Sequence, residues 1–304
     1  MSFSILIRAK NKLLNIIDAW KFRAFSRKYP IRVMSSLDTL RYIRRTHCSV
    51  ARFGDGELNM FLTDKSIGFQ PYDPALAEAL QRVLFDRRED LLLCLPHQFQ
   101  RFSGEKILAR DFWKVFLRKN KAEIFHLLEH NGMHGYLFGD TQTTRPYMDY
   151  VPAPPVLAEA VYAGFKELWA GKRLLIVEGS STRMGRGNDL FDGASSVHRI
   201  ICPSENAFAR YQEILKTVST SAADYDMTLI ALGPTATVLA ADLSRLGYQA
   251  LDLGHIDVEY EWFKAGATKK TALKNKYVNE VKGGRIQASS EDHEYQEQII
   301  AVVE

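Results

Sequence analysis

The sequence has few of the features that cross-link or anchor a chain. Its 304 residues include three cysteines, which form no CxxC pair, and no apolar run approaches the roughly 18 residues of a membrane-spanning helix. It also contains no internal repeat and no low-complexity tract. These absences argue against a disulfide-stapled secreted domain, a membrane-spanning protein and a repeat array. We therefore expect a cytoplasmic protein in a reducing compartment.

What is present is an ordinary globular composition with an uneven charge. Apolar residues make up 46% of the chain and charged residues 25%, which is typical of one large soluble domain or two modest ones. The formal net charge is +4, but residues 1–45 contain eleven Lys or Arg against two Asp, a local charge of +9. The remainder is therefore net acidic.

The basic lead, residues 1–36, also carries many apolar side chains. Such a segment is suited to peripheral contact with an anionic membrane, and residues 1–30 would place the protein at the inner membrane face. The alternative is a helix that packs on its own domain or on a second subunit of a homo-oligomer. No nucleic-acid partner is expected, because the basic residues are not interleaved with a recognisable binding motif.

Beyond the lead, short apolar runs alternate with segments of helical periodicity. This pattern predicts an α/β fold, Rossmann-like, with a mostly parallel sheet and flanking helices. We divide the chain into the lead, a main domain over residues 37–268 and a C-terminal tail over 269–304. The expected strands are 48–53, 89–96, 173–179, 197–203, 227–233 and 248–254, and the expected helices include 37–47, 73–85, 204–218 and 235–247.

Three loops that follow expected strands are candidates for holding phosphate, since ligands bind at the carboxyl ends of parallel strands. The first is rich in glycine and donors, although it matches neither GxGxxG nor a P-loop, and an ordinary βα turn is the favoured interpretation of it by itself. The second begins with a serine that a helix cap alone would explain. The third opens a helix whose first-turn amides and Thr235 hydroxyl suit an anion, and simple capping explains it equally well. The candidate residues are Gly179, Thr182, Arg183 and Arg186 in the first loop, Ser204 in the second, and Gly233 and Thr235 in the third.

The fourth loop, "HIDVEYEW", sets polar side chains at alternate positions. In extended backbone His255, Asp257, Glu259 and Glu261 would project to one side. The stripe is either a catalytic face or a solvated strand face, and its place after an apolar strand favours the first interpretation.

The stretch "RFGDGE" sets Asp55 and Glu57 one residue apart between glycines. In extended backbone the two carboxylates would point the same way, and Gly54 and Gly56 would let a ligand approach the main chain. Two hard oxygen ligands suit Mg²⁺ or Mn²⁺, which take further ligands from water and substrate phosphates. The alternative is a polar turn after a strand.

Several long blocks of the sequence resemble one known family. They include "SVARFGDGELNMF", "IGFQPYDPALAEAL", "LLIVEGSSTRMGRGNDLF", "HRIICPSENAF" and "IALGPTATVLAADLSRLGYQALDLGHIDVEYEW". Together, from about Ser49 to Trp262, they resemble the GT-D-type glycosyltransferases of bacteria, first catalogued as a domain of unknown function. The resemblance implies transfer of a sugar, typically glucose from UDP-glucose, to a glycan acceptor. It also implies a divalent metal held through a DxE motif, here Asp55 and Glu57.

With that resemblance, the other candidates acquire roles. Arg183, Arg186, the amides after Gly233 and also Arg52 would hold the donor phosphates. The general base would be His255, Asp257 or Glu259, and spacing alone does not choose among them. The acceptor would be a surface glycan, on an adhesin-like protein or a lipid carrier. The competing hypotheses are a nucleotide-sugar-binding module and a metal-dependent nucleotide-sugar pyrophosphatase.

Overall fold

The computed structural model describes residues 24–150, 155–274, 276–278, 280–282, 284 and 292–304. The strands are β1 (Arg32–Val33), β2 (Ser49–Arg52), β3 (Leu91–Leu95), β4 (Leu137–Asp140), β5 (Arg173–Gly179), β6 (Ser196–Cys202), β7 (Met227–Ala231), β8 (Ala250–Asp252) and β9 (Ile299–Val302). The α-helices are α2 (Ser36–Thr46), α3 (Asp55–Thr63), α4 (Pro74–Leu84), α5 (Ile107–His130), α6 (Val156–Trp169), α7 (Tyr211–Ala222), α8 (Pro234–Arg245), α9 (Ile256–Lys264) and α10 (His293–Glu297). Short 3-10 turns are η1 (His97–Phe99), η2 (Thr141–Thr144) and η3 (Ala207–Arg210).

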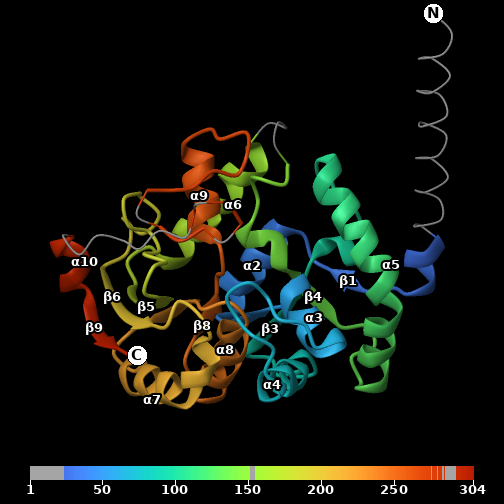
Figure 1. The fold of residues 1–304 in the computed structure, drawn as a ribbon, viewed down its shortest axis with the longest axis horizontal. Coiled ribbons are helices and arrows are strands. Elements are labelled where there is room, and N and C mark those ends of the chain that lie inside the picture. The colour runs from blue at the N-terminus through green and yellow to red at the C-terminus, as the bar shows by residue number, and fades with distance from the viewer. Residues whose placement is uncertain (1–23, 151–154, 275, 279, 283, 285–291) are drawn as a thin grey trace, which may run out of the picture.

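The nine strands among the described residues form one sheet in the order β1-β4-β3-β2-β8-β7-β5-β6-β9 (Figure 1). Every pairing between them is parallel. Val50 of β2 lies opposite Leu92 of β3 and Leu251 of β8, so β2 is central and both its neighbours end at the same edge. The predicted α/β fold with a mostly parallel sheet is confirmed.

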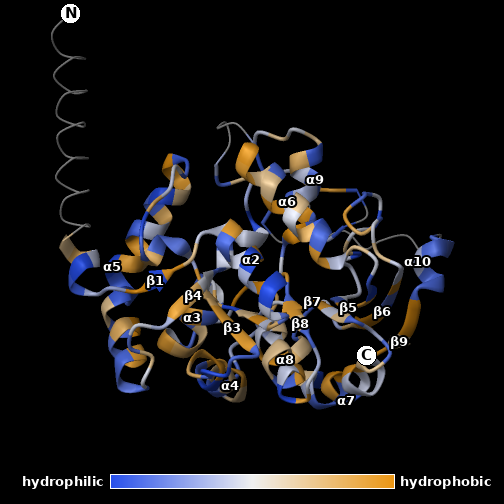
Figure 2. Cartoon of the chain, turned by 180° about the vertical axis from the view of Figure 1, so that it is seen from behind, coloured by the Kyte–Doolittle hydropathy of each residue, from blue (hydrophilic) through white to orange (hydrophobic). Residues whose placement is uncertain are grey.

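Two apolar layers sandwich the sheet. One layer packs alternate strand residues such as Ala51 and Leu93 against α3, α4, α5, α7 and α8, and the other packs Val50 and Leu92 against α2, α6 and α9. Figure 1 shows α4, α7 and α8 on one side of the sheet and α2, α6 and α9 on the other. Figure 2 shows hydrophobic colour along the inner strands and hydrophilic colour on the outer turns of the helices. Such two-sided burial explains why the strands are apolar at consecutive positions.

Local signals explain the helix starts that the sequence predicted. Ser35 caps α2 by accepting a hydrogen bond from the amide of Asp38, and the side chain of Asp73 accepts from the amides of Ala75 and Leu76 at the start of α4. Pro74 occupies the first helical position, where a missing N–H costs nothing.

Two edge strands lie outside the range 37–268 assigned to the main domain. β1 pairs with β4, and β9 pairs with β6, so residues from both the expected lead and the expected tail complete the sheet. Among the helices formed by the described residues, none has both the length and the apolar content that a membrane crossing requires. The membrane-contact prediction rests mostly on residues 1–23, which lie outside the described part of the chain.

Candidate active site

The paired carboxylates lie at the carboxyl end of β2, but in a helix. Asp55 is the first residue of α3 and Glu57 the third, so the extended backbone predicted for them is wrong. The Oε2 of Glu57 reaches back and accepts a hydrogen bond from the amide of Gly54, the helix N-cap, at 2.8 Å. Two acidic residues in the first turn also suit the positive end of the helix dipole. Local capping thus explains why this stretch turns helical at once.

Both carboxyl groups are perturbed. Burial raises the pKa of Asp55, and burial together with the nearby Asp252 raises the pKa of Glu57 to about 7. Asp252, at the end of the adjacent strand β8, also has a raised pKa, caused by burial and opposed by its ion pair with Arg52. Three carboxyl groups therefore crowd one edge of the sheet, which favours a bound cation.

The donor set fits a hard divalent ion that is only partly held by protein. Among the described residues, no group of three or more His, Cys, Asp or Glu side chains is arranged to hold a metal. Alternate side chains of a helix diverge, but the Glu57 carboxylate folds back to the amide of Gly54, directly before Asp55. The pair can therefore supply two oxygen ligands, and Mg²⁺ or Mn²⁺ ordinarily completes such a shell with water and substrate phosphate.

Arg52 is already engaged within the protein. Its Nε donates to the carbonyl of Asp252 at 2.7 Å, its Nη2 donates to Oδ1 of Asp252 at 3.1 Å, and its Nη1 donates to Oγ1 of Thr144 at 2.6 Å. Gly254 is required beside it, because a Cβ there would lie 2.0 Å from Nη2 of Arg52. Arg52 therefore links β2 to β8 and to η2. These contacts position the site, and they engage all three guanidinium nitrogens within the protein.

The stripe "HIDVEYEW" is the helix α9, so the extended conformation predicted for His255, Asp257 and Glu259 is wrong. A helix turns about 100° per residue, and alternate side chains therefore diverge. Asp257 accepts from the amide of Gly185 at 2.9 Å and pairs with Lys276 at 2.7 Å. These contacts make Asp257 an anchor for the glycine-containing loop.

The other two candidates on this stretch differ in exposure. Glu259 is fully buried; its Oε2 accepts from the amide of Met148, and its Oε1 lies 3.6 Å from Nε of Arg145. Burial raises the pKa of Glu259 to about 7, although Arg145 opposes the shift. His255 caps α9 and is half-buried, so of the three it alone is partly open to solvent.

The loop after β5 is held by the C-terminal segment. Arg183 and Arg186 each place a guanidinium nitrogen 2.6 Å from Oδ2 of Asp292, and Arg186 also pairs with Glu294. The amide of Thr182 closes a turn onto the carbonyl of Gly179. The sequence did not predict these carboxylate partners.

Ser204 does not cap the following helix. Its Oγ accepts from the amide of Ser181 at 3.1 Å and shares a hydrogen bond with Oγ of Ser180, so it joins the two loops after β5 and β6. Asn206 instead occupies the N-cap of η3.

The loop after β7 lies beside β2. Gly233 has φ +54°, and α8 begins at Pro234. The hydroxyl of Thr235 is buried and has no hydrogen-bond partner among the described residues. Two residues on, the Oγ1 of Thr237 donates to the carbonyl of Arg52 at 2.9 Å, which places this first turn next to the strand that carries Asp55 and Glu57. The structure thus brings Gly233 and Thr235 to the carboxylates, whereas the β5 and β6 loops lie further along the same edge.

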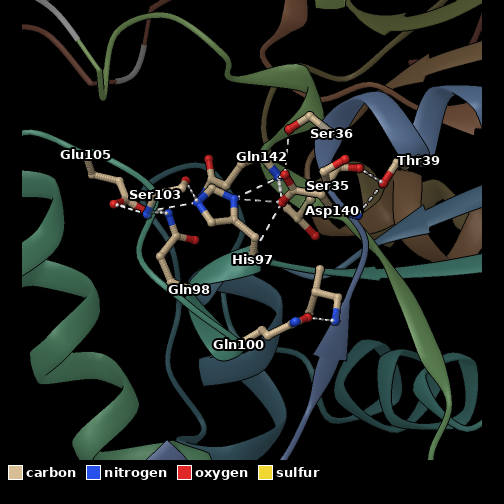
Figure 3. A network of polar contacts seen from close by, with 12 residues as sticks. Ser35, Ser36, Thr39, His97, Gln98, Gln100, Ser103, Glu105, Asp140 and Gln142 are labelled. Carbon is tan, nitrogen blue, oxygen red and sulfur yellow. Dashed lines mark hydrogen bonds and ion pairs between the residues drawn. The ribbon is translucent and has the colours of Figure 1, made fainter. Parts of the chain in front are cut away.

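The sequence analysis missed a buried charged cluster around His97 (Figure 3). The Nδ1 of His97 lies 3.1 Å from Oδ2 of Asp140, and its Nε2 lies 2.9 Å from Oε1 of Glu105 and 2.9 Å from Oγ of Ser103. The two carboxylates raise the pKa of His97 to about 9, although burial alone would lower it. His97 follows the apolar strand β3 directly, and the rule that ligands gather after parallel strands could have drawn attention to it.

A second missed group comes from the expected tail. Glu280 accepts a hydrogen bond from Nη2 of Arg145 at 3.1 Å, its Oε1 lies 2.8 Å from Nη1, and it also pairs with Lys270. No local sequence pattern marked Glu280.

A family model described as "Glycosyltransferase GT-D fold" matches residues 50–281. The chain belongs to the GT-D family. This confirms the family expected from the sequence blocks, and it places the paired carboxylates, α9 and Glu280 inside the GT-D match.

Curated GT-D relatives are considerably longer than this chain. It is 40% identical over 272 residues to the probable glycosyl transferase Gly of Streptococcus gordonii, a match that covers 89% of this chain and 39% of the relative. It is 39% identical over 272 residues to the glycosyltransferase GlyD of Streptococcus pneumoniae serotype 4 (strain ATCC BAA-334 / TIGR4), covering 89% of this chain and 32% of that protein. The chain therefore spans less than half the length of these relatives.

Solved GT-D structures cover nearly the whole fold. One, described as the highly conserved domain of unknown function 1792 with a distinct glycosyltransferase fold, has a TM-score of 0.84 and 44% identity. It covers 93% of this chain and 99% of its own. Another, a glycosyltransferase from Streptococcus sanguinis, has a TM-score of 0.80 and 39% identity, and covers 90% of this chain and 100% of its own.

Proposed function

We propose that this protein is a divalent-metal-dependent glycosyltransferase that moves a sugar, with glucose as the first candidate, from a UDP-sugar donor to a glycan acceptor. The observation that carries the proposal is the pair Asp55 and Glu57, perturbed carboxyl groups at the start of α3 in a chain of the GT-D family. The cation would be Mn²⁺ or Mg²⁺.

Breaking the bond from the anomeric carbon to a nucleoside diphosphate places negative charge on the departing diphosphate. A bound divalent cation supplies Lewis-acid stabilisation of that charge. Asp55 and Glu57 would hold the cation, and the amide and hydroxyl of Thr235 at the start of α8 would bind phosphate oxygens beside it. The N-terminus of α8 belongs to this site because Thr237, in its first turn, donates a hydrogen bond to the carbonyl of Arg52 in β2.

The acceptor hydroxyl must lose a proton as it attacks. Asp257 is held by Gly185 and Lys276, and Glu259 is sealed in the core. His255 is half-buried at the start of α9, next to the end of β8. We therefore assign the role of general base to His255, the one of these three candidates that is partly exposed.

Two further parts of the proposal concern the acceptor and contact with the membrane. The acceptor would be a surface glycan on a glycoprotein or a lipid carrier, and residues 1–30 would hold the protein at the inner membrane face in the second case. A fractionation in which the full chain and a chain lacking residues 1–30 are equally soluble would refute that membrane contact.

The function is tested by following the products from a panel of UDP-sugars, with Mn²⁺ or with EDTA, for the wild type, Asp55→Asn and Glu57→Gln. We expect Mn²⁺-dependent release of UDP that falls by about 100-fold or more in both variants, since they weaken the only protein ligands proposed for the cation. Arg41→Gln, which breaks an ion pair with Asp38 on the solvent-exposed face of α2, is the control and should release UDP normally. Formation of UMP and sugar phosphate would instead identify a pyrophosphatase, and no release from any donor with mixed glycan acceptors would favour a binding module.

A further inference from the structure

Glu280, in the described part of the expected tail, pairs with two cationic side chains, those of Arg145 and Lys270. We call these two side chains the cationic fork. Nη1 of Arg145 lies 2.8 Å from Oε1 of Glu280, and Nη2 of Arg145 donates to Oε2 at 3.1 Å. Lys270 pairs with that same Oε2. A guanidinium with a carboxylate in two parallel hydrogen bonds is a geometry that phosphate oxygens can also satisfy.

This fork lies over the carboxyl end of β2. Arg145 directly follows Thr144, whose Oγ1 accepts a hydrogen bond from Arg52 of β2 at 2.6 Å. On its other side Arg145 lies 3.6 Å from Glu259 of α9. Asp55, at the start of α3, follows Arg52 by three residues, so Arg52 links the turn that precedes Arg145 to the strand that leads into the paired carboxylates. The cations and the paired carboxylates therefore share one site.

Glu280 adds a further negative charge to an edge of the sheet that already carries several carboxyl groups. Asp55, Glu57 and Asp252 all lie at the carboxyl ends of the adjacent strands β2 and β8. The side chains of the fork are not sealed, because Arg145 is 22% exposed, Glu280 20% and Lys270 35%. A partly open Arg and Lys that carry an internal anion beside a proposed metal site are suited to exchange that anion for one from solution.

We propose that Arg145 and Lys270 bind the diphosphate of the nucleotide donor, and that Glu280 occupies their cationic fork until the donor displaces it. The inference rests on the proposed function, since it assigns two residues to the donor of that reaction. The exchange is favourable because a diphosphate brings more negative charge and more acceptor oxygens than one carboxylate. Glu280 acts through Arg145 and Lys270, and is therefore a positioning residue that competes with the donor.

The test is equilibrium binding of UDP, by calorimetry in the presence of Mn²⁺, to the full chain and to single variants. Glu280→Gln keeps the shape and removes the charge, and we expect it to bind UDP about fivefold or more tightly. Lys270→Met and Arg145→Lys should bind UDP about tenfold more weakly, because each loses charge-assisted hydrogen bonds to phosphate. Lys270→Met serves as the second variant, since Arg145 also faces the buried Glu259 and its substitution could disturb folding.

The controls are ion pairs away from β2. Glu213→Gln removes an exposed carboxylate that pairs with Arg210, and Lys264→Met removes a lysine that pairs with Asp189. Both should bind UDP like the wild type. Unchanged or weaker binding by Glu280→Gln, or unchanged binding by a folded Lys270→Met, would overturn the inference while leaving the proposed function standing. A wild type that binds no UDP would overturn both.

Discussion

Replacing His97 with glutamine should remove a large, pH-dependent part of the stability. His97 is 7% exposed and lies between the carboxylates of Asp140 and Glu105, which it contacts at 3.1 and 2.9 Å (Figure 3). Those carboxylates raise its pKa from 6.5 to about 9. A shift of that size corresponds to about 3 kcal/mol of folding free energy carried by the imidazolium.

The sign of the pH dependence follows from the direction of the shift. A group whose pKa is raised by folding contributes fully below its unfolded pKa, and the contribution disappears as the pH rises through the folded value. The stabilisation by His97 should therefore be complete near pH 6 and largely lost by pH 10. The neutral His97→Gln lacks this titration, so the wild type and the variant should converge at alkaline pH.

The assay is urea denaturation of both proteins at pH 6, 8 and 10, read as the free energy of unfolding. We expect His97→Gln to be less stable by about 3 kcal/mol at pH 6 and by much less at pH 10. His134→Gln is the matched control, because His134 also contacts a carboxylate, that of Glu129 at 2.8 Å, but its side chain is 83% exposed. A difference between the wild type and His97→Gln that stays constant or grows with pH would refute the reasoning.

Two further predictions concern the base and the α8 turn. His255→Asn should lower transfer to an acceptor by about 100-fold or more while UDP affinity stays unchanged, and a parallel loss of UDP affinity would contradict its assignment as a base. Gly233→Ala should destabilise the protein by about 2–3 kcal/mol in urea denaturation, because φ is +54° and the new Cβ would lie 2.3 Å from Cε2 of Phe69. Gly247→Ala has φ +86° but no atom within 4 Å, so it should cost less; equal costs would show that the contact with Phe69 is unimportant.

The central sheet was predictable because both its faces are buried. Runs such as Leu91–Leu95 are apolar at every position, which is typical of a parallel strand covered by helices on both sides. β1 has two residues and β4 contains the sequence LFGD, so neither carries a run long enough to detect. β9 pairs with β6, nearly a hundred residues earlier in the chain, and such pairing leaves no local signal.

The two wrong conformations at the site have different physical causes. At Asp55 and Glu57 the strand ends two residues before a glycine N-cap, and acidic residues at the first and third positions of a helix were a signal that the extended interpretation overlooked. Along α9, polar and apolar residues alternate as in a strand. This helix is nevertheless buried at both kinds of position: Lys276 pairs with Asp257, and the Met148 amide donates to one oxygen of Glu259.

The site residues that could not be predicted are those brought in from afar. Glu280 reaches Arg145 across 135 positions, and Asp292 reaches Arg183 across 109. Each pair is defined only once the C-terminal segment packs against the loops that follow the strands. The sequence located the chemistry of Asp55 and Glu57, whereas their charged surroundings depend on tertiary structure.

The most direct test of the account is Mn²⁺ binding measured by electron paramagnetic resonance, with and without UDP, for the wild type and Asp55→Asn/Glu57→Gln. The account predicts that UDP strengthens Mn²⁺ binding to the wild type, because two carboxylates need phosphate oxygens to complete the shell. It predicts that the double variant loses this binding. Mn²⁺ bound equally by both proteins, or bound by the wild type without any effect of UDP, would contradict the claim that Asp55 and Glu57 hold the cation for a nucleotide donor.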